Sequence, residues 1–236
     1  MGEDSNLVSK EAMEAMAGVF NAPAVVDAKK YLKKNGYSLE ADASQARLWC
    51  EAKVDTGDVE AMYVLACLYA YGFGGEKYIQ RAISLCRQAA SNGYLRASLL
   101  LASLLICGEK LSEEDLKEAN KLLEDASDKG DMDARYSMAL LALNGIGRER
   151  DRGYAILQLE DLVKQGYTDA KCALATELFN EGSTGATKRA IDLVIEAADA
   201  NDPLANYLLA NFYLSGIHGF PKDEEKSQFY IQRIGK

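Results

Sequence analysis

Small and apolar side chains recur every three or four residues in two kinds of segment along the chain. One kind is represented by residues 60–72 and the other by residues 80–92. This spacing places the apolar side chains on one face of an α-helix. The two segments are closed by Gly72 and Gly93, because glycine ends a helix in the left-handed conformation without a steric penalty. The pattern therefore predicts pairs of helices, each pair joined by a short polar loop.

The helix pairs repeat with a period of about 36 residues. Four columns of small residues share the same successive steps of 36, 37, 36 and 35 residues, which coincidence does not explain. The columns are Ala61, Ala97, Ala134, Ala170 and Ala205; Ala66, Ala102, Ala139, Ala175 and Ala210; Ala46, Ala82, Ala119, Ala155 and Ala190; and Gly57, Gly93, Gly130, Gly166 and Asn201. A further set of glycines is predicted to end the first helix of each pair: Gly72, Gly108, Gly145, Gly182 and Gly216.

A single helix pair cannot cover its own apolar face, so successive pairs must stack into an all-α solenoid. The predicted domain organisation is an N-terminal capping helix within residues 1–21, followed by one repeat array over residues 22–236. The array divides into a degenerate pair and five clear ones: 22–57, 58–93, 94–130, 131–166, 167–201 and 202–236. The column containing Ala139 is expected to mark the place where the helices cross closely, because a small side chain is needed there.

Composition and charge narrow the classes of partner. The chain carries 36 acidic and 27 basic residues, a net charge of −9, and so repels nucleic acid and anionic membranes. No apolar run approaches the roughly 20 residues of a membrane span, and no secretory signal opens the sequence. The five cysteines show no paired spacing and are expected to be buried and reduced, which favours the cytoplasm. A periplasmic or secreted location is the alternative if a leader has been removed.

Catalytic and ligand-binding motifs are absent from the pattern. His218, the one histidine, has no further metal ligand nearby and is expected to be an exposed loop residue. The run from Gly72 to Lys77 resembles a phosphate-binding loop but lacks the required spacing, so a repeat turn is the better interpretation. The acidic residues near Ser112 and Asp223 are interpreted as helix caps. We therefore expect no enzyme activity, no metal and no cofactor.

The repeat resembles the Sel-one-like repeat family, a relative of the tetratricopeptide repeats. The best match is Ala205-Asn-Tyr-Leu-Leu-Ala-Asn-Phe-Tyr-Leu-Ser-Gly216 with the following Gly219-Phe220-Pro221-Lys222-Asp223. The resemblance covers residues 24–236 and implies a right-handed α-solenoid. The chain departs from the family at one frequent glycine of the first helix, which is alanine here. It also lacks the cysteines that staple the hairpins of a secreted subset.

The resemblance implies that the first helix of each pair lines a concave groove. The residues expected to bind a partner there are Tyr63, Cys67, Arg96, Leu99, Ser103, Asp133, Tyr136, Leu140, Cys172, Thr176, Tyr207 and Asn211. Glu60 and Asp169 are expected at the groove's rim. Packing against the neighbouring pair is an equally weighted role for the tyrosines.

The function expected from the repeat and the missing catalytic groups is a non-catalytic scaffold or adaptor that binds a protein segment or domain. An alternative is an immunity protein that neutralises a toxin or effector, because an acidic surface suits a basic partner site. Enzyme activity and glycan binding are weaker alternatives.

Overall fold

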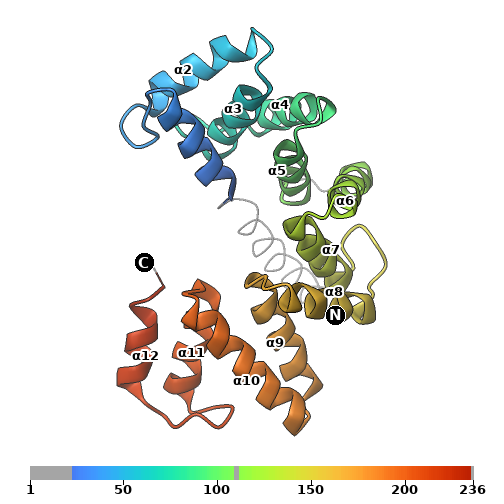
Figure 1. Cartoon of the computed structure of the whole chain (residues 1–236), viewed down its shortest axis with the longest axis vertical. Coiled ribbons are helices and arrows are strands. Elements are labelled where there is room, and N and C mark those ends of the chain that lie inside the picture. Colours follow the sequence, from blue (N-terminus) through green and yellow to red (C-terminus); the bar gives the residue numbers. More distant parts are fainter. Residues whose placement is uncertain (1–22, 109–111, 235–236) are drawn as a thin grey trace. The chain divides into compact units, whose positions relative to one another are not determined.

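A computed structural model describes residues 23–108 and 112–234 of the chain. The predicted capping helix within residues 1–21 lies outside this part. All regular structure in the described residues is helical, which confirms the all-α fold (Figure 1). The helices group into two compact units, one ending at Asp151 and the other beginning at Arg152. The sequence suggested one continuous array, whereas the boundary between the units falls inside the predicted pair 131–166.

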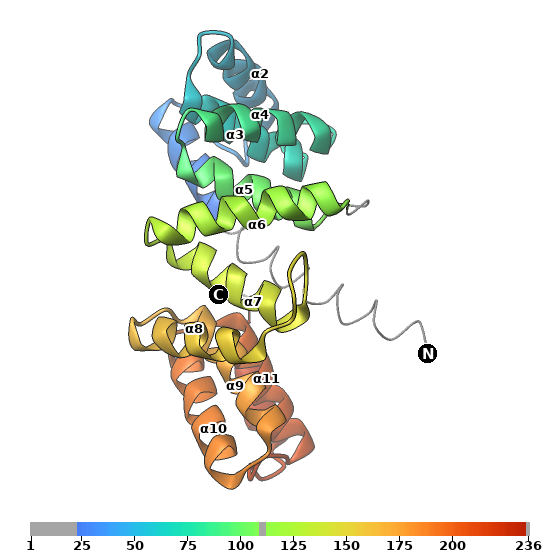
Figure 2. The same cartoon turned by 90° about the vertical axis from the view of Figure 1, so that its right-hand side faces the viewer.

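The first unit contains a helix over residues 23–34 and six further helices. These are α2 (Ala43–Val54), α3 (Val59–Tyr71), α4 (Ile79–Ser91), α5 (Leu95–Ile106), α6 (Glu113–Asp128) and α7 (Met132–Asn144). From α2 onward, each helix packs against the next one along the chain (Figures 1 and 2). This arrangement is the stacking of helix hairpins in chain order that defines a solenoid.

The second unit follows the same plan. It contains α8 (Arg152–Lys164), α9 (Asp169–Glu181), α10 (Thr184–Asp199), α11 (Pro203–Ser215) and α12 (Glu224–Ile231). Again each helix packs on its neighbour in sequence. The loop that links the two units contains Gly145 and Gly147, both with positive φ, and ends in a run of charged residues.

Aspartates begin the first helix of three hairpins. The side chains of Asp58, Asp131 and Asp202 accept hydrogen bonds from the backbone N–H three residues later, at 2.9, 2.9 and 2.7 Å. Such caps satisfy one of the free amides at a helix start. The acidic runs near Ser112 and Asp223 have the same role, since each side chain accepts from the N–H three residues on. The interpretation of these runs as caps is confirmed.

Glycine ends most of the first helices as predicted. Gly72, Gly145, Gly182 and Gly216 have φ between 66° and 74°. The prediction is wrong for Gly108, which does not have positive φ, because α5 ends one residue earlier with Cys107 as its cap. The second glycine column also adopts positive φ throughout, and Asn201 takes the same conformation at 63°.

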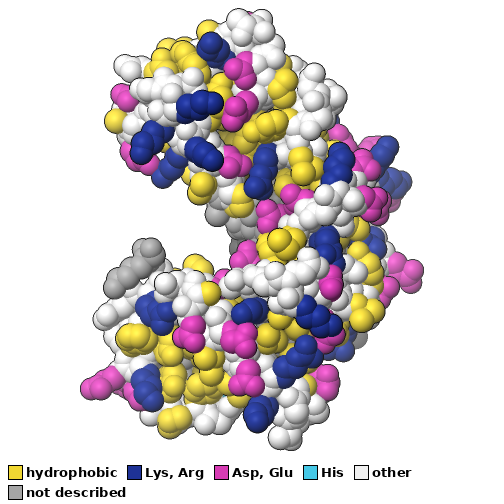
Figure 3. All heavy atoms as spheres, in the orientation of Figure 1, with side chains coloured by type: hydrophobic (Ala, Val, Ile, Leu, Met, Phe, Trp, Pro, Cys, Tyr) yellow, Lys and Arg dark blue, Asp and Glu magenta, His cyan; other side chains and the backbone are white. Residues whose placement is uncertain are grey.

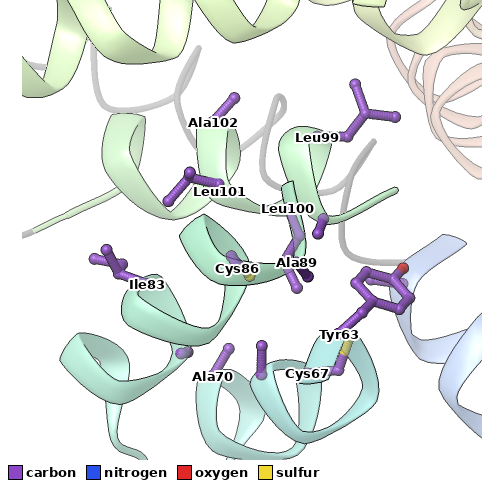
Figure 4. Packing of buried hydrophobic residues seen from close by; sticks show 14 of the residues in the cluster. Tyr63, Cys67, Ala70, Ile83, Cys86, Ala89, Leu99, Leu100, Leu101 and Ala102 are labelled. Atoms are coloured by element: carbon purple, nitrogen blue, oxygen red, sulfur yellow. The ribbon is translucent and has the colours of Figure 1, made fainter. Parts of the chain in front are cut away.

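The core of the first unit runs along the hairpins. Figure 4 shows Cys86 and Ala89 of α4 lying between Leu100 of α5 and Cys67 of α3. The alanine column that contains Ala139 is buried at every position, as expected of closely packed helices. The members of this column are Ala66, Ala102, Ala139, Ala175 and Ala210.

The cysteines differ from expectation at one position. None of the five forms a disulfide, and Cys50, Cys67, Cys86 and Cys172 are buried. Cys107 is exposed, because it stands at the end of α5, where the packed face of the helix stops. His218 is exposed as predicted, although its ring also lies 4.3 Å from that of Phe179.

The glycines of the predicted turn at residues 72–77 serve packing. A side chain at Gly74, whose φ is 74°, would overlap the carbonyl oxygen of Ala43. Gly75 similarly leaves room for the guanidinium of Arg47. The turn therefore needs glycine so that α2 can approach its backbone, and no phosphate is required to explain it.

Candidate functional site

A ladder of polar side chains connects four hairpins of the first unit. Arg96, near the start of α5, lies 3.5 Å from Asp27 Oδ2 and 3.4 Å from Asp133 Oδ2. Asp27 belongs to the helix at residues 23–34, and Asp133 belongs to α7. The Tyr63 hydroxyl of α3 donates a hydrogen bond to the same Asp27 oxygen at 3.3 Å. The first helices of successive hairpins are thus linked at their N-terminal ends.

The fold positions these groups through the repeat itself. Asp27 precedes Tyr63 by one 36-residue period, so both side chains occupy the same place on successive first helices. The column of Asp27 and Tyr63 continues at Leu99, and Arg96 lies one helical turn before Leu99. The long Arg96 side chain spans the distance between the carboxylates on either side.

Burial and charge set the protonation of this ladder. Burial raises the pKa of Tyr63 well above its usual range, with Cys67 and Asp27 adding to the increase. Burial also raises the pKa of Tyr94 to about 12. Partial burial opposes the charge of Arg96, but the carboxylates of Asp27 and Asp133 outweigh it and raise the pKa. The tyrosines are therefore neutral and the arginine is cationic at pH 7.

A hollow of about 270 Å³ opens beside the ladder. Three cations and two carboxylates border it together with tyrosine rings, and the rings of Tyr63 and Tyr94 lie 5.3 Å apart. The charged residues are Asp27, Lys30, Lys34, Glu60 and Arg96. Figure 3 shows charges of both signs interleaved with hydrophobic side chains over the first unit. Rigid aromatic surface beside hydrogen-bonding charges is typical of protein contact sites.

Six of the twelve side chains predicted to bind a partner do not face open solvent. The buried ones are Tyr63, Cys67, Leu99, Ser103, Tyr136 and Cys172. The expectation that they point into an open groove is corrected, because the first helices are covered by neighbouring helices on most sides. Tyr63, for example, is only 2% exposed, and its hydroxyl emerges just far enough to reach Asp27.

The other six predicted residues retain exposed surface. Arg96 and Asp133 belong to the ladder, and Leu140 is partly exposed on α7. Thr176, Tyr207 and Asn211 lie in the second unit, where Tyr207 is 55% exposed and Thr176 donates to the Cys172 carbonyl oxygen. The structure therefore brings together Tyr63, Arg96 and Asp133.

Sequence reasoning missed Asp27, Lys30 and Lys34. Their hairpin is degenerate, so the alanine columns that guided the alignment are weak there. Extending the column of Tyr63 back by one period would have found Asp27.

The described part of the chain offers little for other chemistry. Within residues 23–108 and 112–234, no group of three or more His, Cys, Asp or Glu side chains could hold a metal ion. Among the helices of these ranges, none has both the length and the apolar character needed to cross a membrane.

The stacked hairpins define an α-helical repeat protein of the solenoid class. The Sel1 repeat model matches residues 59–94, 96–131, 133–157 and 203–234, which is more than half of the chain. The chain therefore belongs to the Sel1 repeat family, and the resemblance noted from its sequence is confirmed.

Known proteins share this fold across much of the chain. The crystal structure of a Sel1 repeat protein from Oxalobacter formigenes is 25% identical, with a TM-score of 0.72, and the match covers 87% of this chain and 82% of that one. DAP3-binding cell death enhancer 1 from Rattus norvegicus is 30% identical over 142 residues, or 60% of this chain and 26% of the relative. Sel1-repeat-containing protein YjcO from Escherichia coli K12 is 27% identical over 126 residues, 52% of this chain and 54% of the relative. The chain thus spans between a quarter and just over half of these curated relatives.

Proposed function

We propose that this protein is a non-catalytic scaffold that binds a segment of a partner protein at the hollow beside Arg96. Sel1 repeat proteins generally mediate protein–protein interactions, which supports the class of function. The name of the rat relative describes that protein as binding another protein, DAP3. The observation that carries the location is the ladder from Asp27 through Arg96 to Asp133, because it holds an arginine in place next to two tyrosines.

The chemistry of the hollow favours a polar segment with groups of both signs. Lys30, Lys34 and Glu60 are exposed around it, and the partly exposed Tyr94 offers rigid apolar area at a low entropic cost. Arginine and tyrosine are also the residue types that most often dominate binding energy at interfaces. No observation favours the toxin-inhibitor alternative, so the proposal stops at partner binding. We also propose a cytoplasmic location, which the five cysteines without a disulfide support.

Site-specific photo-crosslinking in a lysate of the source organism tests the proposal. A photoreactive amino acid is placed at Lys34 or Glu60 in the hollow, and at exposed Lys121 on α6 as the matched control. The proposal expects the same partner to be cross-linked from both hollow positions and not from Lys121. Equal labelling from all three positions, or no protein adduct from the hollow, contradicts it.

A further inference from the structure

A second recess lies at the opposite end of α5 from the Arg96 hollow. It has a volume of about 910 Å³ and is bordered by the first half of α4, the last turns of α5 and the start of α6. We call it the α4–α5 groove. Its apolar lining includes Tyr71, Ile79 and Leu105, so a ligand there would leave water for a hydrophobic surface. The groove belongs entirely to the first unit.

Two cations on this groove lack an acidic partner. Lys77 and Arg81 are exposed, and within the described residues neither forms an ion pair with a carboxylate. Arg81 contacts aromatic groups instead, lying 5.1 Å from the ring centre of Tyr78. Uncompensated cations are notable in a chain whose net charge is −9. Asp115 also lines the groove, where its carboxylate accepts a hydrogen bond of 2.6 Å from the Ser112 hydroxyl, so cations still outnumber carboxylates on the described lining.

Arg87, a third cation on the same groove, is paired with a carboxylate. Its guanidinium forms two hydrogen bonds with Glu118, of 2.9 and 2.6 Å. This paired arrangement ties α4 to α6 and so holds two walls of the groove in place. Lys77 and Arg81 therefore remain available for a ligand, while Arg87 has a structural role.

We propose that the α4–α5 groove binds an extended segment of a partner protein that carries carboxylates next to apolar side chains. The carboxylates would pair with Lys77 and Arg81, and the apolar side chains would cover Tyr71 and Ile79. Charge complementarity selects this occupant, because an anionic group is attracted to the two cations and repelled by most of the remaining surface. Arginine can also hold a carboxylate through two parallel hydrogen bonds.

A random heptapeptide library displayed on phage tests the proposal with the full chain immobilised. The same library is screened against the double variant Lys77→Glu/Arg81→Glu. The matched control is Lys33→Glu/Lys121→Glu, which makes the same change in net charge at exposed positions outside the groove. Circular dichroism and thermal melting verify that both variants keep the wild-type fold. An Arg96→Ala variant separates binding at the groove from binding at the hollow.

The proposal expects wild type to enrich peptides that combine Asp or Glu with apolar residues. Synthetic copies should bind the groove variant at least about tenfold more weakly, but bind the control and Arg96→Ala with wild-type affinity. Enriched peptides without an excess of acidic residues would overturn the proposal. So would equal affinity for the groove variant, or a failure to enrich any peptide.

Cys107 gives an independent readout of location. It lines the groove and is exposed, whereas the other four cysteines are buried. A bound peptide should slow the reaction of Cys107 with a thiol reagent several-fold, and the groove variant should lose this protection. An unchanged reaction rate at saturating peptide would show that the peptide binds elsewhere and would contradict the proposal.

Discussion

The guanidinium carbon of Arg47 lies 4.3 Å from the centre of the Tyr69 ring. The centre of the Tyr78 ring is 4.9 Å from the same carbon, and the guanidinium donates a hydrogen bond of 3.1 Å to the carbonyl oxygen of Glu76. Arg47 is 8% exposed, and besides these contacts with α3 and the loop before α4 its Nε lies 3.7 Å from Glu51 Oε1 on its own helix. The contact joins the degenerate first hairpin to the first clear repeat.

Replacing Arg47 with alanine should therefore destabilise the first unit. Loss of a buried charge-assisted hydrogen bond and a cation–π contact is expected to lower the free energy of unfolding by about 2–3 kcal/mol. Arg47→Lys should recover only part of this, because lysine lacks the planar group that contacts both rings. Urea denaturation followed by circular dichroism measures the effect. Lys53→Ala, an exposed cation on the same helix, is the control, and equal losses in both alanine variants would contradict the account.

Gly74→Ala should be more damaging than Gly57→Ala, although both glycines have positive φ. Nothing lies within 4 Å of a side chain added at Gly57, so only backbone strain of about 1–2 kcal/mol is expected there. At Gly74 the added carbon also overlaps the Ala43 carbonyl oxygen. This overlap should lower the free energy of unfolding of Gly74→Ala by at least about 1 kcal/mol beyond the loss in Gly57→Ala. Thermal unfolding of the two variants compares them, and identical melting temperatures would be inconsistent with the close approach.

Ala139→Leu tests the packing of the alanine column. Ala139 has no exposed surface, and a larger side chain at such a position typically costs about 1–3 kcal/mol. The melting temperature should fall measurably. Ala52→Leu on exposed surface of α2 makes the same chemical change and should leave the melting temperature almost unaltered. A wild-type melting curve for Ala139→Leu would show that the column does not mark a tight helix crossing.

Stability should fall in alkaline solution, partly through Cys50. Burial raises the pKa of its thiol from 9.0 to about 12, and Asp58 and Glu51 add to the increase. Between these values the unfolded chain loses a proton that the native protein retains. The stabilisation that the protonated Cys50 thiol gives the native protein is therefore complete below pH 9. As the pH rises from 9 toward 12, the free energy of unfolding falls by about 1.4 kcal/mol per pH unit. Unfolding free energies measured from pH 8 to pH 10.5 should decline less steeply for Cys50→Ala, and parallel declines would exclude this role.

Much of the fold was predictable because the repeat imposes the same backbone requirement again and again. Gly57 and Asn201 occupy one column and share the left-handed conformation, which the sequence predicted for the glycines that close helices. The end of α5 was not predicted, because Gly108 fits the column although Cys107 already caps the helix. The division at Asp151 was also missed, since regular spacing continues across it.

The candidate site was only partly predictable. The repeat columns named Arg96 and Asp133 as rim positions of a groove, and the structure places their charged groups 3.4 Å apart. They did not reveal that Tyr63 is buried, because the cover over a first helix comes from the helices of the hairpins stacked on either side of it. The α4–α5 groove was missed for a related reason. Lys77, Arg81 and Cys107 lie in different segments, and only the packing of α4 against α5 brings them to one recess.

The affinity of the cross-linked partner for the purified full chain tests the central claim most directly. Titration calorimetry compares wild type with Arg96→Ala and with the exposed control Lys121→Ala, each checked for an unchanged melting curve. Loss of a dominant arginine contact should weaken binding by about tenfold or more, and the control should match wild type. Wild-type affinity in Arg96→Ala would contradict the assignment of partner binding to this hollow.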